Sequence, residues 1–238
     1  MNMNLKMIGA SLALSWGVAQ AGVIQVGGSN AGADGKISNR IGVCTITFNG
    51  GNATNSCGAL YSSDAAGTQP LAASHFPIGS SSGQYATPAG DSTRYLTVGP
   101  TAGTPIYVTL ANAASYFGFY AGSLDTFNLV QFFMGTTLVD SFTGDQINAV
   151  AFPGDPTSGN QAQAQFIDYF PGTFVNGAFI PALFTSVRFS STSDAFETDS
   201  HAFGLVSPNA VPEPGSIALF GLGALAVFAN RRRKAQKA

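Results

Sequence analysis

Three carboxylates close together in the sequence, between residues 194 and 199, are the first candidates for a binding or catalytic site. Asp194 precedes a segment in which Glu197 and Asp199 lie two residues apart. Side chains two apart on a β-strand point to the same face, so Glu197 and Asp199 should lie together. Clustered carboxylate oxygens suit Ca²⁺, which prefers oxygen ligands. The pattern predicts either a calcium site at Asp194, Glu197 and Asp199 or, as the simpler interpretation, a solvated acidic strand face.

Catalytic arrangements are harder to find. Asp125 and Glu197 could supply the paired carboxylates of a secreted hydrolase. His75 and His201 are the only histidines, and His201 is expected to be a surface or strand-end residue. Gly79–Gly83 matches G-x-S-x-G by letter, but it lies in a Ser-rich loop where that motif requires a strand and a helix. No catalytic residue is therefore assigned, and no cofactor beyond structural Ca²⁺ is expected.

The two cysteines, Cys44 and Cys57, enclose the turn-rich Asn49–Asn52. In an exported protein a disulfide is the leading interpretation. A hairpin closed by this bond would bring the two residues together. A metal site is less favoured because no histidine lies nearby.

The N-terminus has the pattern of a secretory signal peptide covering residues 1–21. Lys6 supplies a positive charge, Met7–Val18 is a short and mostly apolar stretch, and Ala19 and Ala21 form the small-x-small cleavage pattern of signal peptidase. The alternative is a buried N-terminal helix. The apolar stretch is too short for a permanent membrane span, which takes ~20 residues.

The C-terminus carries three features in order over residues 211–238. Pro212, Glu213 and Pro214 form a segment that the two prolines keep extended. Ile217–Ala229 is uncharged and apolar; the uncharged stretch from Gly215 to Asn230 would be about 24 Å long as a helix, slightly short for a permanent span. A basic cluster then predicts a cytoplasmic stop by the positive-inside rule. Its residues are Arg231, Arg232, Arg233 and Lys234.

Charge divides unevenly between the tail and the body, which we place at residues 22–210. Between Gly22 and Val211 there are four basic and eleven acidic residues, so this region has a formal charge of −7, whereas the whole chain is at −2. Nucleic-acid binding relies on cationic side chains that neutralise phosphate. The acidic body therefore argues against a nucleic-acid partner.

The body is predicted to be all-β. Short aromatic and β-branched runs recur between Gly, Pro, Asn and Asp, and no segment has a sustained helical period. Val187–Phe189 and Phe196–Asp199 alternate apolar with polar residues and should be half-buried antiparallel strands. Gly135-Thr136 predicts a two-residue hairpin turn, and residues 62–91 predict a long loop. We expect an antiparallel, jelly-roll-like β-sandwich, flanked by a signal helix and a C-terminal transmembrane helix.

The C-terminal arrangement resembles the PEP-CTERM sorting signal, which exosortase, a membrane-embedded cysteine protease or transpeptidase, recognises. The resemblance implies that Pro212, Glu213 and Pro214 are read by that enzyme, and that the membrane contact is transient. A simple C-terminal membrane tail is the alternative. Tyr116–Asn128 and Ala195–Asp199 also resemble secreted β-rich proteins found in front of this tail.

These observations predict a protein of a Gram-negative bacterium, delivered to the cell envelope, cell surface or extracellular matrix. We expect it to be non-enzymatic and associated with extracellular polysaccharide. A secreted carbohydrate-active hydrolase and a lectin-like binding module are the alternatives.

Overall fold

The computed structural model describes residues 22–122, 124–153 and 164–208. The predicted signal peptide, the sorting motif, the transmembrane helix and the basic cluster lie outside these residues. Within them, no helix is long and apolar enough to cross a membrane.

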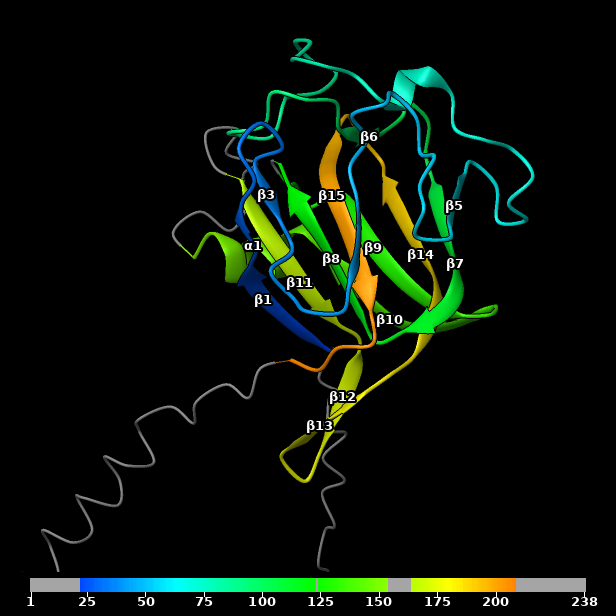
Figure 1. Ribbon diagram of the computed structural model, residues 1–238, viewed down its shortest axis with the longest axis vertical. Helices are drawn as coiled ribbons and strands as arrows, with labels where there is room; N and C mark the ends of the chain where they lie inside the picture. Colours follow the sequence, from blue (N-terminus) through cyan, green and yellow to red (C-terminus); the bar gives the residue numbers. More distant parts are fainter. Residues whose placement is uncertain (1–21, 123, 154–163, 209–238) are drawn as a thin grey trace, which may run out of the picture.

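Two antiparallel sheets form the body (Figure 1). The first sheet has the order β1-β11-β8-β15-β4, and β6 also pairs with β15. Its strands are β1 (Val23–Gly27), β4 (Cys44–Ile46), β6 (Leu96–Val98), β8 (Tyr116–Ala121), β11 (Gln165–Phe170) and β15 (Phe196–Gly204). The second sheet has the order β10-β9-β14-β7-β5. Its strands are β5 (Ala59–Ser62), β7 (Ile106–Ala114), β9 (Asn128–Met134), β10 (Thr137–Thr143) and β14 (Phe184–Ser191).

Smaller elements surround the sheets. β2 (Ser29–Asn30) pairs with β3 (Lys36–Ile37), and β12 (Gly172–Val175) pairs with β13 (Ala178–Pro181). Among the described residues, the helical elements are a 3₁₀ turn, η1 (Ala73–His75), and one α-helix, α1 (Gly144–Ala151). The all-β prediction is confirmed.

The core between the sheets is rich in aromatic residues, because apolar and polar residues alternate along strands such as β14 and the apolar ones point inward. In β14, Val187 and Phe189 are fully buried while Arg188 is partly exposed. Phe189 meets Phe117 and Phe119 of the opposite sheet at ring-centroid distances of 5.9 and 5.5 Å. Such edge and tilted contacts add to the stabilisation from burial of apolar area.

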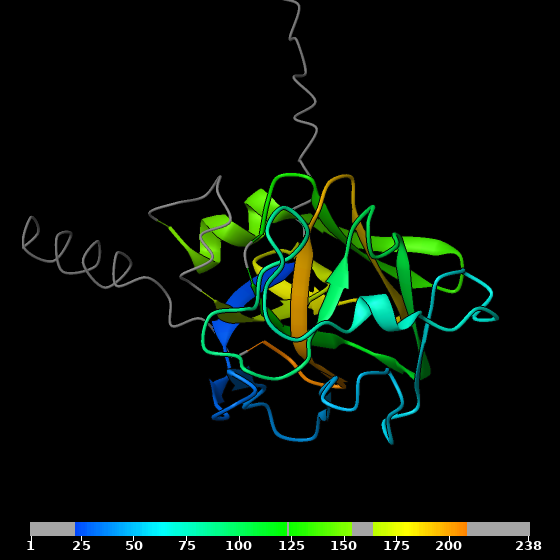
Figure 2. The same ribbon diagram turned by 90° about the horizontal axis from the view of Figure 1, so that it is seen from above.

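The first sheet is buried on both faces, which the sequence did not predict. The N-terminal segment around β2 and β3 and the loops before β6 lie over its outer face (Figures 1 and 2). A second apolar cluster that includes Tyr116, Phe166 and Phe170 fills that layer. The prediction that Phe196–Asp199 is half-buried was therefore wrong: every residue from Phe196 to Phe203 is buried.

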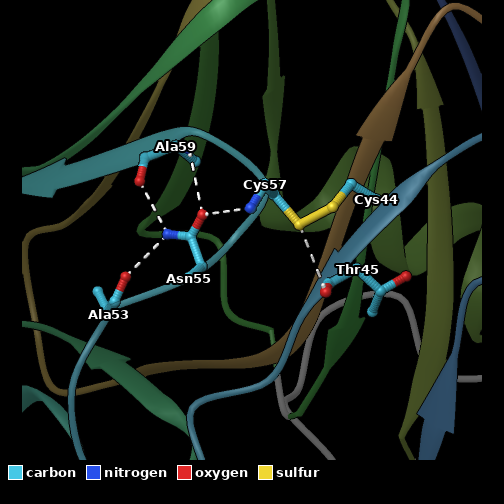
Figure 3. Close-up of a disulfide and its surroundings, with 6 residues drawn as sticks. All are labelled: Cys44, Thr45, Ala53, Asn55, Cys57 and Ala59. Carbon is cyan, nitrogen blue, oxygen red and sulfur yellow. Dashed lines mark hydrogen bonds between the residues drawn. A yellow bond between two sulfur atoms is a disulfide. The ribbon is translucent and has the colours of Figure 1, made fainter.

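The disulfide forms between Cys44 and Cys57, but it does not close a hairpin (Figure 3). Cys44 begins β4 of the first sheet, and Cys57 lies two residues before β5 of the second sheet. Asn55 fixes the approach of Cys57, because its side-chain oxygen accepts hydrogen bonds from the backbone N–H groups of Cys57 and Ala59 at 3.0 and 3.2 Å. The bond therefore links the two sheets at one edge.

Several local predictions are confirmed and one helix was missed. Gly135-Thr136 forms the turn between β9 and β10, with Gly135 at φ 59°. After Ser62, which ends β5, residues 63–91 contain only η1 and isolated bridges. α1 escaped detection because it has only two turns; Gln146 accepts a hydrogen bond from the Thr143 N–H at 2.9 Å and so caps its start.

We predict that replacing both cysteines by serine will destabilise the body without changing its fold. Cross-linking residues 13 apart restricts the unfolded chain, and loops of this size are associated with about 3 kcal/mol of stability. Urea unfolding of the variant and the oxidised wild type should show a loss of this order, with a somewhat larger m-value for the variant because its unfolded chain is less compact. An equal midpoint for the two proteins would contradict the role of the bond between the sheets.

Candidate functional site

A polar cavity of about 390 Å³ lies at the end of the sandwich where β15 begins. The loop Ser80–Ala86 forms one wall, and Asp125, Asp194, Ala195 and Glu197 complete it. The cavity thus joins three carboxylates with serine hydroxyls, the Gln84 amide and the Tyr85 phenol. We call it the Ser-loop pocket.

Glu197 is the most buried of the three carboxylates that line the Ser-loop pocket. It lies on the outer face of β15, and only 2% of its surface is exposed. One of its carboxylate oxygens accepts a hydrogen bond from the Ala86 N–H at 2.7 Å, which holds the loop against the strand. Gly122 packs beside it, and a Cβ there would lie 3.1 Å from Cβ of Glu197. Glu197 thus has a structural contact and also faces the cavity.

Asp125 is placed by a network that the sequence did not reveal. The buried Asn128 side chain accepts a hydrogen bond from the Asp125 N–H at 2.6 Å and donates to Ser191 Oγ at 2.9 Å. Asn148 of α1 donates to the Leu124 carbonyl at 2.7 Å. Asn128 and Asn148 fix the loop that carries Asp125. A buried asparagine beside a turn was the signal that could have identified them.

Asp194 borders the Ser-loop pocket from the turn before β15. Its carboxylate accepts hydrogen bonds from the backbone N–H of Thr101, at 3.0 Å, and from the Thr101 hydroxyl. These contacts orient the carboxylate and join the turn to the loop after β6.

The Ser80–Ala86 loop is anchored at both ends. Tyr95 donates a hydrogen bond to the Gly79 carbonyl at 2.7 Å, and burial raises the pKa of Tyr95, so the phenol keeps its proton. Ser80 Oγ accepts a bond from the Thr87 N–H at 2.9 Å. The ring of Tyr85 packs edge-on against Tyr95, with centroids 6.4 Å apart. The loop that matches G-x-S-x-G by letter is thus a closed polar turn.

The predicted calcium ligands are only partly brought together. Asp194 and Glu197 border the Ser-loop pocket, but Asp199 does not. Among the described residues, no group of three or more His, Cys, Asp or Glu side chains is placed to hold a metal ion. The alternative interpretation of Glu197 and Asp199 as a solvated acidic face was wrong, since both are buried beneath the covering loops.

Asp199 lies in an unusual environment on the outer face of β15. Its side chain is fully buried, and its carboxylate oxygens make no hydrogen bond of good geometry, although the backbone N–H groups of Ser200 and Phe48 partly oppose the rise of its pKa. Burial, together with the nearby Asp91 and Asp34 carboxylates, raises the pKa of Asp199 to about 8. The folded protein therefore keeps this carboxyl protonated at neutral pH.

The two histidines lie away from the Ser-loop pocket lining. His201 was predicted at the surface, but it is fully buried among Phe48, Phe117 and Phe189. Burial lowers the pKa of His201 to about 3, and its ring nitrogens lie 2.9 Å from the Tyr61 and Thr198 hydroxyls. The reason for the error is a bulge at Ser200, where φ is 51° and the register with β8 shifts. This shift turns His201 inward.

We predict that Asp199→Asn will stabilise the protein at pH 8 and leave it nearly unchanged at pH 4. The unfolded carboxyl ionises above pH ~4, whereas the folded one stays protonated up to about pH 8. The wild type therefore loses stability between these two pH values, and the neutral amide does not. Thermal unfolding at a series of pH values measures the difference.

Asp145→Asn is the matched control, because Asp145 is exposed at the start of α1. This variant should show no gain at pH 8 and at most a small loss, because the negative charge of Asp145 favours the N-terminus of α1. A gain for Asp199→Asn that is equal at pH 4 and pH 8 would contradict the raised pKa.

Comparison with known proteins identifies the C-terminal segment. The family described as the PEP-CTERM protein-sorting motif matches residues 210–234, which contain the predicted Pro212, Glu213 and Pro214. No curated protein and no solved structure matches the chain. The chain therefore carries a PEP-CTERM sorting motif and is an exported bacterial protein that exosortase sorts to the cell envelope or surface.

Proposed function

We propose that the mature body is a non-enzymatic surface or matrix protein that binds extracellular polysaccharide in the Ser-loop pocket. The observation that carries this proposal is the lining itself, in which three carboxylates face hydroxyl and amide groups across a cavity of about 390 Å³. Carboxylate and amide oxygens accept hydrogen bonds from sugar hydroxyls, and serine hydroxyls both donate and accept them. The ring of Tyr85 offers a surface on which a sugar can pack.

The walls of the Ser-loop pocket are held in place by hydrogen bonds, which favours binding of a ligand to a preformed site. Tyr95 holds the Ser80–Ala86 loop. Asn128 holds the turn that carries Asp125, and Thr101 holds Asp194. A site whose walls are already ordered loses less conformational freedom when a ligand binds. This mode of binding does not require Ca²⁺. That a Ca²⁺ ion bridges the carboxylates of the pocket is a separate proposal, which a calcium titration would test.

The strand order supports a jelly-roll description of the body. The orders β6-β15-β8-β11 and β7-β14-β9-β10 place consecutive strands alternately in the two sheets, apart from the β9–β10 hairpin. Eight strands in this arrangement form a double Greek key, an architecture that lectin domains use. The likeness is one of fold, so it adds to the argument from the pocket without replacing it.

A hydrolase is the second candidate, and one observation favours it. Asp125 and Glu197, far apart in sequence, line the same pocket. Two carboxylates across a sugar-sized cavity are the arrangement that glycoside hydrolysis uses. In this role Glu197 would keep the hydrogen bond from the Ala86 N–H, which fixes its carboxylate.

We further propose how the protein is processed in a Gram-negative host. Signal peptidase cleaves after Ala21, and exosortase cleaves near Pro212–Pro214 while the apolar segment and the basic cluster hold the end in the membrane. The uncharged stretch is short for a permanent span, which supports a temporary anchor.

We predict that the mature protein binds bacterial exopolysaccharides and that Glu197→Gln and Tyr85→Ala each weaken this binding about tenfold or more, the effect of losing ~1.4 kcal/mol. A glycan array followed by calorimetry measures the affinity. Asp145→Asn is the control for the carboxylate change and should bind normally. Reproducible turnover of a glycan, lost in Glu197→Gln, would instead establish the hydrolase.

We predict that the surface form ends near the sorting motif. Intact-mass analysis of protein from cells with exosortase should show loss of residues beyond Pro214, and cells without exosortase should retain them. Replacing Pro212 and Glu213 by alanine should also retain the tail, while Pro208→Ala, just outside the motif match, should not. A tail that persists in the wild-type surface form would refute this processing scheme.

A further inference from the structure

The hairpin β12–β13 projects from the sandwich (Figure 1). Phe174, Val175, Ile180 and Leu183 are 40%, 52%, 50% and 45% exposed. Residues 171–183 contain no charged side chain. An exposed apolar group of this kind on a hairpin normally marks an interaction surface, because natural hairpins protect such edges with charge.

The hairpin is built to hold its tip in place. Asn176 and Gly177 have φ values of 50° and 80°, the left-handed pair that a tight two-residue turn requires. The rings of Phe174 and Phe179 pack at 5.3 Å between centroids. The tip is thus an ordered apolar projection.

Both ends of the described chain leave the body beside this hairpin. Gly22 and Gly172 donate their backbone N–H groups to the same carboxylate oxygen of Asp140, at 2.8 and 3.3 Å. Val206 and Phe179 pack against the same apolar cluster. The route to the sorting motif therefore begins at the base of the hairpin.

The length of the tail then limits how far the hairpin can lie from the membrane. Pro208 and Ile217, where the apolar segment begins, are nine residues apart, and fully extended chain spans about 30 Å over that distance. While the segment is in the membrane, the hairpin end of the body cannot move farther away than this. Its local concentration at the bilayer surface is therefore high.

We propose that the β12–β13 hairpin docks on the lipid bilayer while the C-terminal segment is still inserted. Aromatic and aliphatic side chains without charge favour the interface between headgroups and hydrocarbon. The acidic body rules out attraction to anionic lipid, so the contact depends on apolar insertion and is insensitive to salt. Docking holds the residues around Pro212 close to the membrane, where exosortase acts, and the weak contact is lost once the tail is cut. The inference rests on the temporary anchoring in the proposed function.

A single tryptophan tests the contact. The chain has one tryptophan, Trp16, within the predicted signal peptide, so Phe174→Trp provides a unique reporter in the mature protein that still carries its tail. This protein, from cells without exosortase, is reconstituted into phosphatidylcholine vesicles with brominated acyl chains. We expect a shift of its emission to shorter wavelength and loss of intensity, at low and high salt alike.

Ile78→Trp is the matched control, because Ile78 is 61% exposed and follows η1 at the opposite end of the sandwich (Figure 1). Its emission should be unchanged by the brominated lipid. Equal quenching at the two positions, or none at Phe174→Trp, would overturn the proposal. Quenching that requires exosortase in the vesicles would also overturn it, because the enzyme would then be the partner. A blue shift without quenching that disappears on dilution would overturn it as well, because it would indicate a second copy of the protein as the partner.

The cellular consequence is measured separately. Phe174→Ser combined with Ile180→Ser should slow removal of the tail, whereas Ile78→Ser should not. Removal of the tail at the wild-type rate in the double variant would contradict the positioning role. If the wild-type tail is never removed, the sorting proposal fails, and the vesicle experiment still decides whether the hairpin docks.

Discussion

The structure depends on the burial of the outer face of the first sheet beneath chain that has little regular structure. That face carries charged and polar side chains, so the covering segment has to provide their partners. Arg40 forms an ion pair with Asp168 at 2.6 Å, and Asp168 is fully buried. Tyr116 also donates to Asp168 at 2.7 Å, and the guanidinium lies 5.2 Å from the ring centroid of Phe170. Removing one member of such a pair leaves a buried charge, which costs about 3–5 kcal/mol, so the segment that carries Arg40 cannot leave without unfolding the layer.

Close approach of that layer requires space at two glycines. A Cβ at Gly27 would lie 2.3 Å from a carboxylate oxygen of Asp168, and one at Gly118 would lie 2.3 Å from the Tyr116 hydroxyl. Both positions face the ion pair rather than a turn. The same layer that holds the ion pair also buries Asp199 and the carboxyl of Glu197, and so it determines which acidic groups meet solvent. Of Glu197 and Asp199, only Glu197 lines the Ser-loop pocket. These two carboxyl groups therefore have different roles although they lie on the same face of β15.

Sequence patterns predicted the strands well and their surroundings poorly. Alternation identifies a strand such as β14, because one face meets the core and the other meets water. It misjudged β15, because the loops that cover its outer face have no period that a sequence can reveal, and because the bulge at Ser200 changes the phase between Asp199 and His201. The disulfide was predicted from two cysteines and the compartment, but its place between the sheets depends on strand order, which short-range patterns do not contain. Asp125 and Glu197 were paired as candidates by residue type alone. They line one cavity because the chain crosses from β8 of the first sheet to β9 of the second at the end of the sandwich where β15 begins.

The two ends of the sandwich therefore have different surroundings. The Ser-loop pocket lies among the loops where β15 begins, and the β12–β13 hairpin lies at the end where β15 finishes and the chain continues toward the sorting motif (Figure 1). In the anchored state that we propose, the hairpin end lies near the bilayer and the pocket faces away from it. The arrangement also explains the distribution of charge. The sequence has a cluster of cations, Arg231 to Lys234, in the tail, while the region from Gly22 to Val211 has a formal charge of −7. In the proposed scheme, removal of the tail leaves the uncharged hairpin as the remaining membrane contact, and the polar pocket then provides the attachment to polysaccharide.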